Sequence, residues 1–174
     1  TISELEGPTV GIVLGDLCFN VYHLMARWKQ SIVRTGVPFY AVPGNHDHVS
    51  EFKSDRKSTE TYTEYFGPEN HAFFIGKDLV IMLDNIIHGV DNKHKYTEGY
   101  SDEQLAWVKA LLKLIPKNAD IYVGQHSPTN GRSYLRDESE AYLITNGSEF
   151  LSLFGDRNVH LISGHNHINM NFQY

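Results

Sequence analysis

The chain has 174 residues, which is enough for one domain with a substantial hydrophobic core and too few for two typical domains. Its 15 basic and 21 acidic residues give a formal charge of −6, so electrostatics offer no basis for binding nucleic acid or a membrane surface. One cysteine excludes an intrachain disulfide framework, and no apolar run approaches the roughly 20 residues of a membrane span. We therefore predict a single domain over residues 1–174.

The first forty residues predict a strand, a helix and a second strand. Residues 10–14 and 39–42 are short apolar runs rich in β-forming side chains. Between them, Asn20 is a candidate N-cap for a helix over residues 21–35, which Gly36 ends. The apolar residues of this helix recur at helical spacing and are expected to face the core: Val21, Leu24, Met25, Trp28 and Ile32. Such a unit predicts parallel strands with a right-handed crossover.

The middle of the chain predicts an antiparallel hairpin, since residues 72–75 and 79–83 are strand-like and a turn separates them. Together with the parallel unit, the hairpin predicts a mixed sheet. Asp84, at the end of this hairpin, is interpreted as an acid that holds a loop rather than as a metal ligand.

The last third predicts a helix followed by two further strands. Ser101 and Gln104 form a capping box at the start of an amphipathic helix that Pro116 ends. Residues 121–124 and 159–163 are strand-like, and a short helix is expected around residues 148–154.

Three polar segments are expected to be loops that shape the substrate site: residues 48–59, 86–100 and 129–139. His48 lies in the first of them. We interpret it as a solvent-exposed loop histidine in preference to a substrate contact.

Side chains that can bind metals follow four of the predicted strands. They are Asp16, the run Asn45-His46-Asp47, His126, and the pair His165 and His167. Ligands collect at the carboxyl ends of strands in open α/β sheets, so four such placements in one chain indicate a common site.

The residue types of this set favour particular metals. Asp16 offers a carboxylate oxygen, Asn45 an amide oxygen, and three histidines offer imidazole nitrogens, while no thiolate takes part. A mixed oxygen and nitrogen set favours Mn, Fe or Zn over calcium or soft-metal centres. His46 can instead face the substrate, where it would donate a hydrogen bond or a proton.

The sequences Gly15-Asp16, Gly44-Asn45-His46-Asp47, His126 and Gly164-His165-Asn166-His167 resemble, in this order, the motifs of the calcineurin-like metallophosphoesterases. The resemblance extends from residue 10 to residue 167. It implies an α/β fold in which mixed sheets form a β-sandwich flanked by helices, in αββα layers. It also implies a metal-dependent hydrolase, either a phosphomonoesterase or a phosphodiesterase, acting on a small-molecule phosphate ester.

The resemblance further implies a binuclear centre of two divalent metal ions, about 3.5–4 Å apart. Asp16 would bridge the ions, one of which would take Asn45, His126 and His165, and the other His167. A metal-activated water would attack phosphorus. His46 would be the catalytic residue that stabilises the transition state and assists the leaving oxygen.

Two departures from the family pattern matter. No Asp-x-His occurs in the sequence, although this first motif should lie before residue 10, so we expect either a missing N-terminal strand or a degenerate site. In the phosphoprotein phosphatases an Asp stands where Phe19 is found, and a Glu stands in place of Asp47. These differences favour a bacterial phosphoesterase of the purple-acid-phosphatase-like or cyclic-nucleotide-phosphodiesterase-like branch.

Two alternatives remain open at this point. One is a non-catalytic binding scaffold that keeps the fold and has lost one metal site. The other is a mononuclear metal hydrolase that acts on something other than a phosphate ester.

Overall fold

The computed structural model describes residues 7, 9–89, 96–129 and 144–167. In chain order its elements are β1 (Gly11–Leu14), η2 (Tyr22–Leu24), α1 (Met25–Val33), β2 (Phe39–Val42), α2 (Asp55–Ser58), α3 (Glu60–Phe66), β3 (His71–Ile75), β4 (Asp78–Leu83), β5 (Ile86–His88), β6 (Tyr96–Glu98), α4 (Asp102–Leu112), β7 (Ile121–Gln125), α5 (Gly147–Ser152) and β8 (Val159–Ser163).

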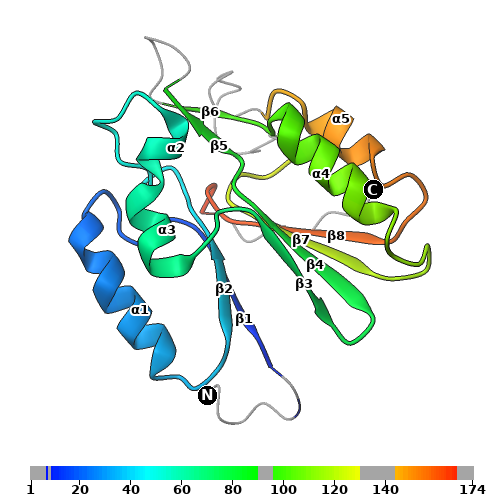
Figure 1. The fold of residues 1–174 in the computed structure, drawn as a ribbon, viewed down its shortest axis with the longest axis horizontal. Helices are drawn as coiled ribbons and strands as arrows, with labels where there is room; N and C mark the ends of the chain where they lie inside the picture. Colours follow the sequence, from blue (N-terminus) through cyan, green and yellow to red (C-terminus); the bar gives the residue numbers. More distant parts are fainter. Residues whose placement is uncertain (1–6, 8, 90–95, 130–143, 168–174) are drawn as a thin grey trace.

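The described strands form three sheets: β1 with β2, the four strands β3, β4, β7 and β8, and β5 with β6. The first two of these sheets lie between two groups of helices (Figure 1). α1 and α3 lie beside β1 and β2, whereas α4 and α5 pack on the sheet that contains β4 and β7. This arrangement confirms the α/β sandwich with mixed sheets and flanking helices that the sequence predicts. None of the described helices has the length and apolar character that a membrane span requires.

Strand β4 explains why the layers stack in this order. It is buried along nearly its whole length, and its side chains alternate between two different partners. Leu79 and Ile81 belong to the cluster that includes the core residues of α4, while Val80 and Met82 pack with Val42 of β2. A strand covered on both faces has a continuous apolar sequence, as residues 79–83 do.

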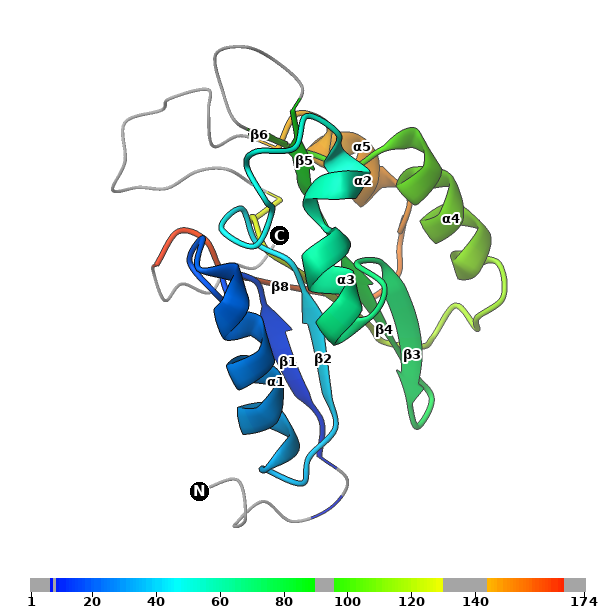
Figure 2. The ribbon, with the colours of Figure 1, turned by 60° about the vertical axis from the view of Figure 1, so that its left-hand side comes forward.

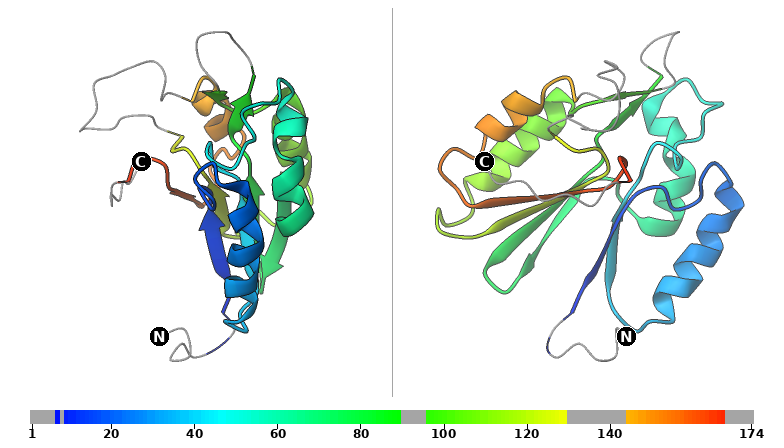
Figure 3. Two further views of the ribbon diagram at one scale, coloured as in Figure 1. Left: turned by 90° about the vertical axis from the view of Figure 1, so that its left-hand side faces the viewer. Right: turned by 180° about the vertical axis from the view of Figure 1, so that it is seen from behind.

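The strand pairings agree with the parallel unit and the antiparallel hairpin that the sequence predicts. β1 pairs with β2 in parallel, and the larger sheet has the order β3-β4-β7-β8. Within this four-stranded sheet, β3 is antiparallel to β4, whereas β4, β7 and β8 are parallel to one another, which confirms the predicted hairpin and the mixed sheet. Seen from behind in Figure 3, β8 ends beside the loop that follows β1. The ends of strands from both sheets therefore meet at one place.

Helix α4 begins as its sequence predicts. The side chain of Ser101 accepts a hydrogen bond from the main-chain N–H of Gln104, and the Gln104 side chain accepts one from the main-chain N–H of Ser101. This reciprocal pair satisfies two N–H groups that the helix itself leaves without partners.

Several predictions about local structure need correction. The helix expected over residues 21–35 is present as the 3-10 turn η2 followed by α1, but Asn20 does not cap it, because its side chain contacts His46 instead. Val21 and Trp28 of the expected core stripe are exposed. The expected loop at 86–100 pairs as β5 and β6 at its two ends. Nearly all of the loop predicted at 129–139 lies outside the described residues.

Candidate metal centre

The loops that follow β1, β2, β7 and β8 meet at one end of the two sheets. Figure 2 shows the loops after β1, β2 and β8 close together above the strands. They bring together four of the five predicted metal ligands around Nε2 of His126. This atom lies 3.0 Å from Oδ1 of Asn45, 3.1 Å from Nδ1 of His165 and 3.4 Å from Oδ1 of Asp16.

The tautomer of His126 follows from its other ring nitrogen. Nδ1 lies 2.6 Å from the main-chain carbonyl oxygen of Leu14. A carbonyl oxygen only accepts, so Nδ1 carries a proton and donates it to this hydrogen bond. Burial lowers the pKa of His126, and the nearby Asp16 carboxylate offsets this only in part. The ring is therefore neutral, and Nε2 directs a lone pair toward the oxygens of Asn45 and Asp16.

Several lone pairs directed toward one point are typical of a site that binds a cation. Two ligand atoms that each lie about 2.1 Å from one ion are about 3.0 Å apart at a right angle and about 3.4 Å apart at the tetrahedral angle. The three distances at His126 span this range. Among the described residues, no three His, Cys, Asp or Glu side chains are already arranged to hold an ion, and this includes Asp16, His126 and His165, so the set is a candidate site that also needs the Asn45 amide. Its two nitrogen and two oxygen donors fit a divalent ion such as Mn, Fe or Zn.

The fifth predicted ligand takes no part in the contacts around His126. His167 is exposed, and in the described part of the chain its side chain has no hydrogen bond or ion pair with the other four. Its backbone has a positive φ of 54°.

Backbone strain is concentrated at the same place. Within the described residues, non-glycine residues with positive φ occur only in the loops after β1 and β8: Asp16, Phe19, Asn20, His165 and His167. Positive φ is uncommon for residues other than glycine, and the 47° of Phe19 is a marked outlier for a bulky side chain. Strained residues cluster at functional sites, where the surrounding contacts hold them in place.

Two glycines allow the loops to approach so closely. A Cβ atom on Gly15 would lie 2.5 Å from the main-chain nitrogen of Gly44 and 2.6 Å from Nδ1 of His126. A Cβ atom on Gly44 would meet the main chain of Asp16 at 2.5 Å. Only glycine fits at these positions, and the two glycines thereby allow Asp16, Asn45 and His126 to share one site.

Asp47 joins the loop after β1 to the loop after β2. Its carboxylate is fully buried and accepts hydrogen bonds from the main-chain N–H groups of Leu17, Cys18 and Gly44, at 3.1, 3.1 and 2.9 Å. Bonds to a carboxylate are stronger than those between neutral groups. The acid of the Gly-Asn-His-Asp motif therefore fixes the loops that carry Asp16 and Asn45.

His46 is held on two sides. Its Nδ1 lies 2.8 Å from Nδ2 of Asn20, and its ring stacks on the ring of Phe19 with the centroids 4.0 Å apart. The Phe19 side chain is nevertheless largely exposed, so an exposed apolar surface borders His46.

His48 is buried, which corrects the sequence-based interpretation. Its ring is fully enclosed, with Nδ1 2.8 Å from Oγ of Ser58 and Nε2 3.4 Å from Oδ2 of Asp84. Oδ1 of Asp84 also accepts a hydrogen bond from the main-chain N–H of Ile86 at 3.0 Å. The prediction that Asp84 holds a loop is confirmed.

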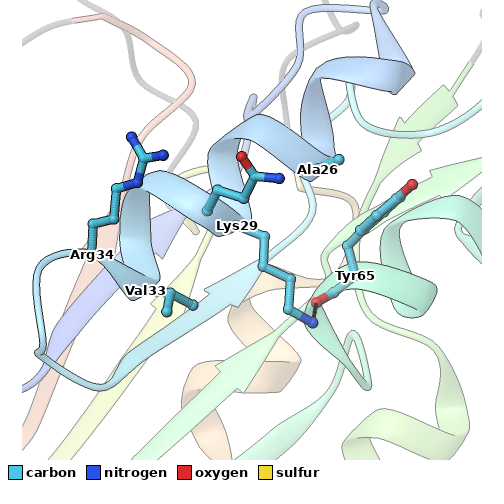
Figure 4. Close-up of a pocket in the computed structure, with 6 residues that line it drawn as sticks. Ala26, Lys29, Val33, Arg34 and Tyr65 are labelled. Carbon is cyan, nitrogen blue, oxygen red and sulfur yellow. Dashed lines mark hydrogen bonds between the residues drawn. The ribbon is translucent and has the colours of Figure 1, made fainter.

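A shallow groove lies away from this site, between α1 and α3. Its lining includes Lys29, Arg34 and Tyr65 (Figure 4). The ammonium group of Lys29 donates to the main-chain oxygen of Tyr65 at 2.5 Å. The groove contains no carboxylate or imidazole among its lining residues, so it offers none of the acid, base or metal chemistry of the His126 site.

The family profile of the calcineurin-like phosphoesterases matches residues 2–169 of this sequence. The chain belongs to this family. Membership of the calcineurin-like phosphoesterases confirms the resemblance on which the fold was predicted, and members of the family generally use divalent metals.

The calcineurin-like relatives include a protein of Arcobacter nitrofigilis described as a "probable glycerophosphodiester phosphodiesterase GpdQ". It is 30% identical to this chain over 125 residues. The match covers 70% of this chain and 42% of the relative, so it spans less than half of the relative's length.

The sequence does not predict the roles of two residues at the site of this calcineurin-like domain, Glu98 and Asn20. Glu98 is buried with Oε1 3.0 Å from Nε2 of His165, but it stands in a polar stretch with no motif around it. Asn20 was assigned to helix capping. The sequence contained a signal for its contact with His46. Asn20 directly follows Phe19, the position at which the phosphoprotein phosphatases have an Asp.

Proposed function

We propose that this chain is a metal-dependent phosphoric ester hydrolase whose site is centred on His126. The observation that carries the proposal is the meeting of three donor atoms, from Asp16, Asn45 and His165, at a His126 nitrogen whose lone pair is fixed by the carbonyl of Leu14. Family membership supports the ester chemistry.

Each side chain has a role in this proposal. Asp16, Asn45, His126 and His165 would hold one divalent ion, and Asp16 and His167 would contribute to a second. Divalent ions held there would supply Lewis acidity toward the phosphoryl oxygens and would lower the pKa of water. Nδ1 of His46 accepts a hydrogen bond from the side-chain amide of Asn20. The proton of the neutral ring is therefore on Nε2, which can donate to an ester oxygen as negative charge develops there.

A small-molecule phosphodiester is the substrate class that we would test first. The relative from Arcobacter nitrofigilis carries the name of a phosphodiesterase. Phosphomonoesters are the comparison, because the residues of the site do not by themselves distinguish the two.

The test uses chelator-stripped protein reloaded with manganese or zinc. Bound metal per chain is measured together with the hydrolysis of bis-p-nitrophenyl phosphate and p-nitrophenyl phosphate. We expect metal-dependent hydrolysis, which His46→Ala should reduce about 10²- to 10⁴-fold. Asn45→Ala should reduce both the activity and the metal content. His23→Ala, at an exposed histidine of η2, is the matched control and should leave both unchanged.

An unaltered rate in His46→Ala would overturn the role of His46. One bound ion with neither ester hydrolysed would instead favour a mononuclear hydrolase of another substrate.

A second candidate function is a non-catalytic binding scaffold. The observation that favours it is that His167 is exposed and, within the described residues, makes no hydrogen bond or ion pair with the other four side chains. If the chain were such a scaffold, it would hydrolyse neither ester when fully loaded with metal. His46→Ala would then leave the bound metal and the metal affinity unchanged. The retention of the set around His126 supports the hydrolase over the scaffold.

A further inference from the structure

A buried carboxylate adjoins the His126 set from the far side of His165. The Glu98 side chain has no exposed surface, and its Oε1 lies 3.0 Å from Nε2 of His165. Apart from this ion-pair contact, neither carboxylate oxygen has a hydrogen-bond partner within the described parts of the chain. Burying a carboxylate charge lowers the stability of the fold unless a partner compensates it, so the burial of Glu98 beside His165 needs a physical reason.

The protein holds Glu98 at this position through its main chain. Glu98 ends β6 and is paired with Ile86 of β5. Its carbonyl oxygen accepts hydrogen bonds from the main-chain N–H of Thr145 at 3.0 Å and from the Thr145 hydroxyl at 3.3 Å. The next residue, Gly99, donates to the carbonyl of Asn85. The carboxylate is therefore fixed by strand pairing and by the segment before α5.

The two ring nitrogens of His165 face different partners. Nε2 faces the carboxylate of Glu98, while Nδ1 lies 3.1 Å from Nε2 of His126. A neutral imidazole has one donor nitrogen and one acceptor nitrogen. A carboxylate beside Nε2 favours the proton at that atom, which leaves the lone pair on Nδ1, where the other donors meet.

We infer that Glu98 is a positioning residue that holds His165 with Nε2 protonated and Nδ1 directed as a metal donor into the Asp16, Asn45 and His126 set. The inference rests on the metal site in the proposed function and adds a residue to it. Carboxylates that hold the second nitrogen of a ligating histidine fix the ring orientation and raise its basicity. The need for such a carboxylate accounts for a buried glutamate whose carboxylate has no hydrogen-bond partner among the residues that the structure describes.

The first test reads the tautomer and needs no metal or activity. Long-range ¹⁵N–¹H correlation spectra of the chelator-stripped chain distinguish protonated from unprotonated ring nitrogens. We expect a protonated Nε2 and an unprotonated Nδ1 at His165, and a loss of this preference in Glu98→Ala. Glu98→Gln keeps the size and an acceptor oxygen, so it should retain the tautomer. The same His165 spectrum in the unaltered chain and in Glu98→Ala would overturn the inference.

The second test measures manganese or zinc affinity by calorimetry. Glu98→Ala should bind metal about 10- to 100-fold more weakly, and Glu98→Gln should recover part of this loss. Glu103→Ala removes an exposed glutamate of α4 and controls for the change in net charge. Equal affinity in Glu98→Ala and Glu103→Ala would contradict the inference. If the unaltered chain binds no metal, the proposed function fails, and the tautomer measurement still decides the role of Glu98.

Discussion

Asn20 and His46 are joined twice, through the main chain and through their side chains. The main-chain N–H of Asn20 donates to the carbonyl of His46 at 2.9 Å, and the Asn20 side-chain amide contacts Nδ1 of the His46 ring at 2.8 Å. The amide donates to Nδ1, so the ring proton of a neutral His46 is on Nε2. The relationship fixes both the place of His46 and the nitrogen that it can offer to a substrate.

We predict that Asn20→Ala lowers kcat for ester hydrolysis about five- to tenfold, the equivalent of one hydrogen bond of about 1 kcal/mol, and leaves KM nearly unchanged. The reason is that the ring loses its preferred tautomer while the proposed metal ligands remain. Steady-state kinetics on metal-loaded protein provide the measurement. Asn118→Ala, at an exposed asparagine, is the control. A change confined to KM would show that Asn20 contributes to binding instead.

Asp47 provides a second prediction, on stability. Asp47→Ala removes the acceptor of three main-chain N–H groups, so we expect the free energy of unfolding to fall by roughly 2–4 kcal/mol. Urea unfolding measures this loss. Asp156→Ala, at an exposed aspartate, should change it by less than about 0.5 kcal/mol.

Cys18 reports on the same loops. Burial, together with the Asp47 carboxylate, raises the pKa of the Cys18 thiol to about 12, so the thiol should react slowly with alkylating reagents in the folded chain. We expect faster labelling of this single cysteine in Asp47→Ala. Labelling as slow as in the unaltered chain would show that the loops stay closed without the carboxylate.

Metal binding should stabilise the folded chain. At a free metal concentration 100 times the dissociation constant, binding contributes about 2.7 kcal/mol, which raises Tm by roughly 5–10 °C for a chain of this size. Calorimetric scans with manganese or zinc and with chelator give this difference. Asn45→Ala should show a smaller difference because it lacks one donor oxygen. An equal rise in Tm in Asn45→Ala would place the bound ion elsewhere.

His48 should make stability depend on pH above 6.5. Burial lowers the pKa of His48, but the carboxylates of Asp84, Asp55 and Asp47 raise it by more, so its net shift is upward from 6.5. The folded state therefore favours the protonated ring. This contribution is complete below the unfolded-state pKa of about 6.5 and is lost as the pH rises through the folded-state pKa.

The measurement compares urea unfolding of the unaltered chain and of His48→Gln between pH 6 and pH 9. The advantage of the unaltered chain should shrink as the pH rises across this range. His23→Gln, at an exposed histidine, is the control. A constant difference for His48→Gln would contradict the prediction.

The sequence by itself determined those features whose partners are local or whose pattern repeats. The strand-like runs at residues 72–75 and 79–83, with a turn between them, specify a hairpin, and Ser101 and Gln104 specify a helix start, because each depends on neighbours within a few residues. Strand ends followed by Asp16, Asn45, His126 and His165 were also readable, since the ends of parallel strands meet at one edge of a sheet.

Only the tertiary structure decided which partner a polar side chain takes. Asn20 has the sequence context of a helix cap but contacts His46, 26 residues away. Glu98 and His48 lie in polar stretches typical of surface loops, yet both are buried against groups from other elements. Local sequence fixes backbone preference. The burial and charge of a side chain depend on the distant segments that fold over it, and for Glu98 and His48 those contacts exist only in the folded chain.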